Sequence, residues 1–399
     1  PLDHERPGAN DNASGCVTRL EVARARSKLS AENKIPRPAR TLRFIWPPEI
    51  EGTMVLLNGK PEMVPHMQAV IHMDMVGGGP VTKAVFHITR SPMSLPTFID
   101  DVAEAFGDFV NRQTFEYAAS GHAAYPLVAP EGGKEPLEAQ FSEYTPGSDH
   151  DIYCEGSYRI PAIYFNDWPD RYIHTNFDSA ANIDPTKLLR AGFLGAASGY
   201  FLANFSANDI DPVFQTIQSR SLVRVSTMLR RNQQLPALDA LGFPNYEMQY
   251  EKGLFESISR FAPIPANEAA EAERFLRNFQ SVGVRVVPLD QIELLSEKGK
   301  VVFTRNPDPK GPVSGLFGYD YFVDHYGADK AAKIRLLKQE STYNREADYP
   351  YEVLNFVDGK RSVQEIRNAV SAEYGPVPLD VVVEYLRALE SIGILKSGS

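Results

Sequence analysis

Four polar residues in the first half of the chain are of types that could carry out metal-assisted hydrolysis. Asp11 lies in the glycine- and asparagine-rich loop GANDNASG, and Glu49 directly follows the run TLRFIWPP. Asp74 lies in HMDMVGGG, and His174 follows the aromatic run IPAIYFNDWPDRYI. Carboxylates and imidazoles are ligands that zinc prefers, and a carboxylate can also act as a general base. Each residue alone is weak evidence, because an Asp in such a loop commonly forms an Asx-turn and a lone His is more often structural.

The elements that would position these four residues alternate between apolar strands and amphipathic helices. Such alternation is typical of an α/β fold with a mostly parallel central sheet and helices on both of its faces. Ligands bind outside the carboxyl ends of the strands in open sheets of this kind, so we expect the four residues to converge there. The predicted strands cover 41–46, 69–76, 84–89 and 160–165, and the predicted helices cover 13–29, 96–113 and 184–205.

Five short segments occur in the same order as the signature blocks of a known enzyme family. They read GANDNASG, RFIWPPEIEGT, HMDMVGGG, PGSDHDIY and RYIHTNFDSAANID. In this order they resemble the co-catalytic zinc aminopeptidases, a family that includes bacterial secreted aminopeptidases and the glutamate carboxypeptidase type. The resemblance covers about residues 1–204, and five ordered blocks are far more specific than any one of them.

The resemblance implies a role for each of the four residues. Asp11 resembles the carboxylate that bridges two zinc ions, Asp74 the ligand of one ion, and His174 the ligand of the other. Glu49 resembles the general base that accepts a proton from the attacking water. Two zinc ions about 3.5–4 Å apart would polarise the scissile carbonyl and lower the pKa of a shared water to about 7. One or two zinc ions are therefore the expected cofactor.

Three further residues of these blocks are expected to support the ligands rather than to bind zinc. Asp149 and His150 match a Ser-Asp-His block, and Asp178 lies shortly after His174. Carboxylates beside a metal site commonly orient the ligands through hydrogen bonds. The alternative for Asp149 and His150 is a helix N-cap and turn without a part in the chemistry.

The first departure from the family pattern lies at the start of the chain. The family has a His-x-Asp block upstream of the bridging Asp, and here Pro1-Leu2-Asp3 occupies that place. Either the His is absent, or the ligand lies in sequence before Pro1; His4 is the nearest substitute, although its register is shifted. A sheet without the upstream strands would expose unpaired edges, so we expect upstream residues to belong to the same folded unit.

The second departure follows the expected base. The family usually has two consecutive Glu residues, the base and then a ligand, whereas Glu49 is followed by Ile50, which cannot bind zinc. Glu51 could replace that ligand only if the backbone turned its side chain, because neighbouring side chains of an extended segment point in opposite directions. Three readings follow from the two departures: a two-zinc enzyme with ligands from elsewhere, an altered single-zinc hydrolase, or a decayed site.

Three units are predicted along the chain. Residues 1–205 would form the zinc aminopeptidase-like catalytic domain, whose N-terminal part is expected before Pro1, and 206–332 a helical connecting region. The last unit, 333–399, reads as helix, turn, helix, turn, helix, and resembles winged helix–turn–helix domains, including small peptide chaperones of peptide-derived cofactor biosynthesis. A divergent aminopeptidase-like branch with a C-terminal winged helix is similar in this respect. The basic run at 219–234 is expected to face solvent or another subunit.

The charge of the chain argues against nucleic acid as a partner. The 399-residue chain has a net charge of −10, and its last predicted helix carries Asp380, Glu384 and Glu390 against Arg387. Phosphates would be repelled by that balance, so nucleic acid is not an expected partner. For the last domain this leaves a packing or dimerisation role, or capture of a peptide by strand addition.

The remaining composition sets few limits. No apolar run approaches the length of a membrane span, and two cysteines are too few for a disulfide framework. The sequence does not decide the cellular compartment, although an extracytoplasmic location is slightly favoured. It does not decide whether the chain forms a homo-oligomer. The leading hypothesis is a zinc-dependent exopeptidase of the aminopeptidase type that acts on peptides. The alternative is a catalytically impaired peptide-binding protein on the same fold.

Overall fold

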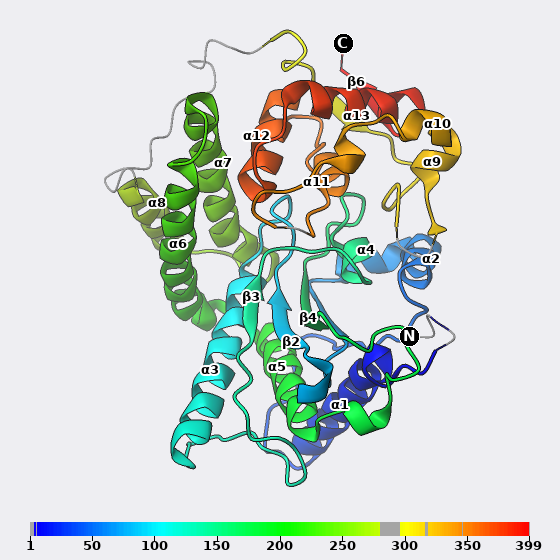
Figure 1. The fold of residues 1–399 in the computed structure, drawn as a ribbon. Coiled ribbons are helices and arrows are strands. Elements are labelled where there is room, and N and C mark those ends of the chain that lie inside the picture. Colours follow the sequence, from blue (N-terminus) through cyan, green and yellow to red (C-terminus); the bar gives the residue numbers. More distant parts are fainter. Residues whose placement is uncertain (1–3, 5, 280–295, 316–317, 345, 399) are drawn as a thin grey trace.

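The computed structural model describes residues 4, 6–279, 296–315, 318–344 and 346–398 (Figure 1). Pro1, Leu2 and Asp3, which take the place of the His-x-Asp block, lie outside the described residues. The chain up to Asn204 forms an α/β unit around one sheet. Some of the later helices lie along one side of this unit, and the C-terminal helices lie over one end of it.

A four-stranded sheet lies at the centre of the N-terminal half. Its strands stand in the order β1-β4-β2-β3, where β1 is parallel to β4, β2 is parallel to β3, and β2 is antiparallel to β4. The sheet is thus mixed, with mostly parallel pairs, and the predicted α/β class is confirmed. The strands span Val70–Asp74 (β1), Val85–Thr89 (β2), Gln140–Ser142 (β3) and Ala162–Trp168 (β4).

Helices cover both faces of this sheet. Helices α1 and α5 contact β1 and α3 contacts β2, whereas α4 contacts β1 and β4. Met73 packs against α5, where Gly195 leaves room for its sulfur. Because side chains alternate along a strand, His72 and Asp74 point to the opposite face. The helices span Gly15–Ala31 (α1), Glu51–Gly59 (α2), Phe98–Ser120 (α3), His150–Cys154 (α4) and Pro185–Asn204 (α5).

Most elements predicted for the first half are confirmed, with one error. The α5 helix begins as expected, with Pro185 in its first turn and the Asp184 side chain accepting a hydrogen bond from the Thr186 N–H at 2.9 Å. The predicted strand at 41–46 is wrong, because these residues belong to no strand. In place of hydrogen bonds to a neighbouring strand, this segment is bound by a side chain: Arg19 of α1 donates to the Ile45 carbonyl at 3.2 Å.

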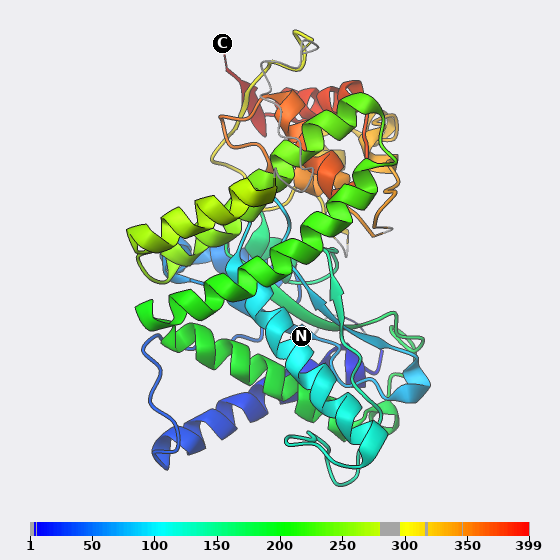
Figure 2. The ribbon, with the colours of Figure 1, turned by 90° about the vertical axis from the view of Figure 1, so that its left-hand side faces the viewer.

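A helical layer follows the α/β unit. It contains Ile210–Asn232 (α6), Ala237–Glu256 (α7) and Ala266–Asn278 (α8), and Figure 2 shows this layer running from the sheet to the C-terminal helices. The expectation that the basic run of α6 faces solvent is wrong for Arg224. Its guanidinium reaches Asp101 of α3 at 2.7 Å and Glu251 of α7 at 2.6 Å, so it joins three helices. Residues 280–295 of the predicted helical connecting region lie outside the described residues.

The C-terminal region packs on the end of the sheet unit and shares one hydrophobic core with it. The β6 strand pairs with β5, which lies before the predicted domain boundary at 333. No described helix has both the length and the apolar content needed to cross a membrane. The elements are Phe303–Arg305 (β5), Tyr321–Tyr326 (α9), Ala328–Ala331 (α10), Tyr349–Asn355 (α11), Val363–Tyr374 (α12), Leu379–Ser391 (α13) and Leu395–Ser397 (β6).

Candidate metal centre and catalytic site

The loop that carries Asp11 is fixed by hydrogen bonds to its own backbone. The Asp178 carboxylate accepts the N–H groups of Asn10 and Asp11 at 2.7 and 2.9 Å, which is the supporting position the sequence suggested. A Cβ atom at Gly15 would lie 2.3 Å from the Met73 carbonyl oxygen, so only glycine allows this close approach. The carboxylate of Asp11 is therefore held in place before any ligand binds.

The same loop is joined to the loop that follows β1. The Asn12 side chain donates to the Met73 carbonyl at 3.2 Å and accepts the Met75 N–H at 3.2 Å. These two residues flank Asp74, so Asn12 fixes the spacing between Asp11 and Asp74. The predicted convergence of the loops at the end of β1 is thus present.

Two imidazoles, from residues near the first and the last part of the α/β unit in the sequence, lie close to Asp11. The Nε2 atoms of His4 and His174 lie 3.3 and 3.0 Å from Asp11 Oδ2, and the two rings are 5.1 Å apart. We call these three residues the His–Asp–His group. Their ligand atoms all lie within 4.8 Å of one another. Two imidazole nitrogens and a carboxylate oxygen are a donor set that suits zinc, so these residues fit the expected ion.

A second polar group lies at the carboxyl end of β1. The Ser148 hydroxyl contacts the Glu49 carboxylate, lies 2.8 Å from Asp74 Oδ2, and lies 2.8 Å from His72 Nε2. We call Glu49, Ser148 and Asp74 the Glu–Ser–Asp group. A hydroxyl has one proton, so Ser148 can donate to only one of the two carboxylates at a time. Asp74 is not in the His–Asp–His group, so the structure places the predicted ligands in two neighbouring sets.

Burial and neighbouring charges set the protonation of the Glu–Ser–Asp group. Glu49 is buried, and this burial, with the charge of nearby Asp74, raises its pKa far above its usual range. The charge of Asp11 acts in the same direction, which shows that the two polar groups are close. When it is ionised, a carboxylate with a raised pKa is a stronger base than a free carboxylate.

The Ser-Asp-His block supports the Glu49 backbone and does not cap α4. Asp149 Oδ1 accepts the Ile50 N–H at 2.7 Å, and its side chain makes no cap bond to the helix. Burial raises the pKa of Asp149 to about 6. His150 is buried against the Tyr164 ring at 4.1 Å, with Nε2 at 2.8 Å from the Thr145 carbonyl oxygen, and burial lowers its pKa to about 4. His150 is therefore a neutral structural residue.

Left-handed backbone occurs at three positions of the site. Ile50, Met75 and His174 each have a φ of +56°, a conformation that non-glycine residues seldom adopt. Two of them directly follow Glu49 and Asp74, and the third is a member of the His–Asp–His group. Such strain gathers at functional sites, where the surrounding contacts hold it.

The structure shows which residues occupy the two positions where the sequence departs from the family pattern. Ile50 is 3 % exposed and packs in a small core with residues such as Leu57 and Ile152, so it takes no part in metal binding. Glu51 begins α2 and does not belong to the His–Asp–His group. His4, in contrast, reaches Asp11 despite its shifted register, so the first departure leaves an imidazole in the site.

Two site residues were not predicted. Ser148 stands directly before the recognised Asp149, and its hydroxyl rather than either neighbour contacts the expected base. His72 stands two residues before Asp74 on the same strand, so the two-residue period of β1 could have placed both side chains on one face.

Sequence comparison now adds to this geometry. A sequence model of peptidase family M28 matches residues 2–198. This segment belongs to peptidase family M28. M28 peptidases are zinc-dependent, and the resemblance drawn from the five blocks is confirmed. The donor set of the His–Asp–His group agrees with that cofactor.

Other comparisons add little to the M28 assignment. A candidate peptidase from Clostridium acetobutylicum has a crystal structure that matches with 13 % sequence identity and a TM-score of 0.32. The match covers 98 % of this chain and 54 % of the other, so the chain spans about half the length of that structural relative. Similarity at this level carries no argument. No sequence among curated proteins matches the chain.

Proposed function

We propose that this M28 chain is an exopeptidase of the aminopeptidase type, which removes the first residue from peptides with the help of zinc. The observation that carries the proposal is the position of the Glu–Ser–Asp group beside the His–Asp–His group at one edge of the sheet. A metal-binding donor set next to a buried carboxylate is the minimum that metal-assisted hydrolysis requires.

The residues of the two groups have different roles in this proposal. His4, Asp11 and His174 would hold zinc, and Asp74 is the candidate ligand for a second ion beside Asp11. Zinc supplies Lewis-acid polarisation of the scissile carbonyl and makes a nucleophilic hydroxide available near neutral pH. Asp178 keeps Asp11 in place through its two N–H bonds.

Glu49 is the proposed general base. It accepts the proton of the attacking water and passes it to the nitrogen of the leaving peptide. Ser148 fixes one carboxylate oxygen of Glu49, and the Asp149 bond to the Ile50 N–H fixes the backbone that carries Glu49. The other oxygen of the Glu49 carboxylate is thereby oriented for the proton transfer.

The competing function is peptide binding by a catalytically impaired member of the fold. Ile50 favours it, because an apolar residue stands where the family usually has a second acidic ligand. Retention of both Glu49 and an imidazole partner for Asp11 favours the enzyme instead.

Metal content and activity together separate the two functions. We expect the zinc-reconstituted protein to hold one to two zinc ions per chain by elemental analysis. It should hydrolyse an unblocked dipeptide but not the same dipeptide with an acetylated N-terminus. A zinc-free protein after reconstitution would contradict the enzyme, as would a zinc-loaded protein that leaves every unblocked peptide intact.

A further inference from the structure

A cleft of about 350 Å³ opens beside the candidate catalytic site. Its lining includes His87 and Thr89 of β2, Asn166 and Trp168 of β4, and Phe141 of β3. A volume of this size lies within the range of small-ligand sites.

Two connections place the cleft next to the proposed base. Asn166 pairs in register with Asp74, so the two side chains lie on the same face of adjacent strands. Thr145, which lines the cleft, belongs to the same loop as Ser148, whose hydroxyl contacts Glu49. The cleft therefore lies within reach of a side chain next to the scissile bond.

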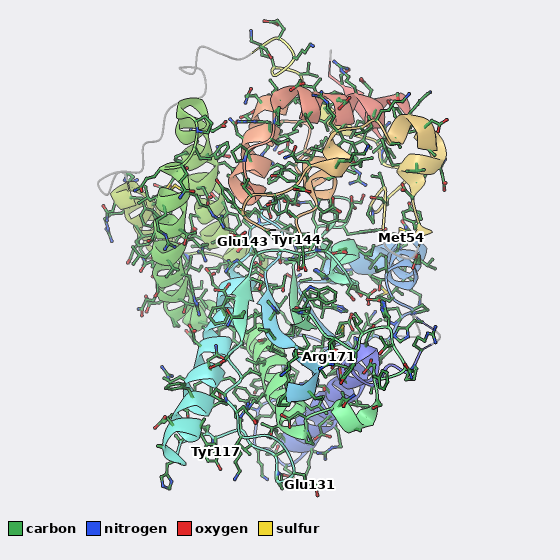
Figure 3. The ribbon with its side chains drawn as sticks, viewed as in Figure 1. Met54, Tyr117, Glu131, Glu143, Tyr144 and Arg171 are labelled. Atoms are coloured by element: carbon green, nitrogen blue, oxygen red, sulfur yellow. The ribbon has the colours of Figure 1, made fainter. Side chains whose placement is uncertain are left out.

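The C-terminal region builds the far wall of the cleft. The Trp168 indole N–H donates to Glu346 Oε1 at 2.6 Å, and the Asn344 side chain donates to the Tyr144 carbonyl at 3.0 Å. Figure 3 labels Tyr144 and its neighbour Glu143 at this junction between the sheet and the C-terminal helices. Residues distant in sequence thus meet across the opening.

The charges along the cleft are unequal. Glu143 is paired with Arg231 at 2.7 Å, and the Arg231 guanidinium also lies 4.3 Å above the Tyr343 ring. His87 is held by Ser142 and by the Trp168 carbonyl, and burial lowers its pKa, so it is neutral. Among the described lining residues, Glu346 is the acid that forms no ion pair, and its side chain is exposed.

We infer that this cleft binds the cationic side chain of a peptide residue, arginine or lysine, next to the scissile bond. Glu346 supplies the opposite charge, and the half-exposed indole of Trp168 supplies aromatic surface that attracts a cation. The inference rests on the proposed function for the position of the scissile bond. It adds the substrate class, which the C-terminal region then selects.

Ligand binding tests the cleft without any catalysis. The chain has two tryptophans, so Trp46→Phe leaves Trp168 as the single source of tryptophan fluorescence. N-acetyl-argininamide, which lacks a free α-amino group, should change Trp168 fluorescence with a lower Kd than leucinamide or N-acetyl-leucinamide. Tighter binding of leucinamide would assign the cation to the peptide N-terminus and overturn the inference.

Substitution of the acid is the second arm. In the Trp46→Phe background, Glu346→Gln should weaken N-acetyl-argininamide about three- to tenfold, the range of an exposed charge with an aromatic contact. Glu131→Gln, at an exposed loop on the opposite end of the sheet unit, should leave the Kd unchanged. Equal Kd values for the Glu346→Gln variant and its parent would overturn the inference.

Kinetics distinguish a failure of the inference from a failure of the proposed function. On unblocked dipeptides, Glu346→Gln should lower kcat/KM for an arginine first residue by the same factor and leave that for leucine within twofold. Equal losses for both residues overturn the inference while the peptidase stands. Absence of all hydrolysis with Glu346-dependent binding retained overturns the peptidase and supports the cationic cleft.

Discussion

Two pairs of buried carboxyl groups in this protein have similar chemistry and different surroundings. At the candidate site, Glu49 and Asp74 share the Ser148 hydroxyl. At the junction with the C-terminal helices, Glu352 accepts the Ser94 hydroxyl at 2.7 Å and lies in hydrogen-bonding contact with Glu373. Burial raises the pKa of both Glu49 and Glu373 above the usual range.

The neighbours of each pair set its role. Main-chain N–H groups of the 91–96 loop reach the junction pair, with Ser94 donating to Glu352 at 3.0 Å and Met93 donating to Glu373 at 3.2 Å. These hydrogen bonds join the 91–96 loop to the C-terminal helices. The site pair lies beside the His–Asp–His group, where the His174 side chain is 53 % exposed. A buried acid pair is thus not itself a catalytic signal; access to solvent and a neighbouring metal-binding set make the difference.

The largest effect should come from Asp11→Ala. Asp11 is the central member of the His–Asp–His group, so its loss should abolish zinc binding and reduce peptidase activity to background. Thermal stability in the presence of zinc should fall too, because bound metal stabilises the native state. Elemental analysis measures the bound zinc, and a melting curve measures the thermal stability. Glu373→Gln, at the junction pair, should keep its zinc; unchanged zinc in Asp11→Ala would reduce Asp11 to a turn residue.

The next effect should come from Glu49→Gln. This change keeps the size of the side chain and removes its ability to accept a proton. The kcat should fall at least about 10²-fold while zinc stays bound, in line with general-base contributions. Steady-state kinetics on the metal-loaded variant measure this. If the variant stays active, Glu49 has no part in the mechanism and Glu51 becomes the residue to replace.

A matched pair of serine variants sharpens the comparison. Ser148→Ala should lower kcat about tenfold with little change in KM, because it releases the side chain of the proposed base. Ser94→Ala removes the corresponding hydroxyl at the junction. It should lower the free energy of unfolding by about 1–3 kcal/mol, the cost of a lost bond to a buried group, and leave kcat unchanged. Similar kinetic losses in both variants would mean that the junction also tunes the site.

The smallest effect concerns the pH dependence of stability. Burial and the neighbouring Glu352 raise the pKa of Glu373 above its usual value of 4.5, so the folded protein holds a proton that the unfolded chain releases. This contribution is complete below about pH 4.5 and declines as pH rises toward the folded pKa, by at most about 1.4 kcal/mol per pH unit. Glu373→Gln should flatten that decline in urea unfolding between pH 5 and 8. An unchanged slope would show that Glu373 does not hold this proton in the folded protein.

Local patterns predicted most of the elements near the site but not all of them. The caps and apolar periodicity of α5 follow from a few consecutive residues, which is why the Asp184–Pro185 start could be predicted. The segment 41–46 has the composition of a strand, yet a strand also needs a partner, and Arg19 takes the Ile45 carbonyl instead. Arg224 looked like a surface residue because its partners, Asp101 and Glu251, are distant in sequence.

The sequence by itself determined the family and the identity of the polar residues, because loops such as GANDNASG carry their own turn chemistry and spacing. Only the tertiary structure decided which of those residues meet. His4 reaches Asp11, Ser148 lies between Glu49 and Asp74, and Ile50 turns into the core. It also brought Glu346 to Trp168, across 178 positions of the chain. Such contacts depend on the packing of whole helices and strands, which no short stretch of sequence specifies.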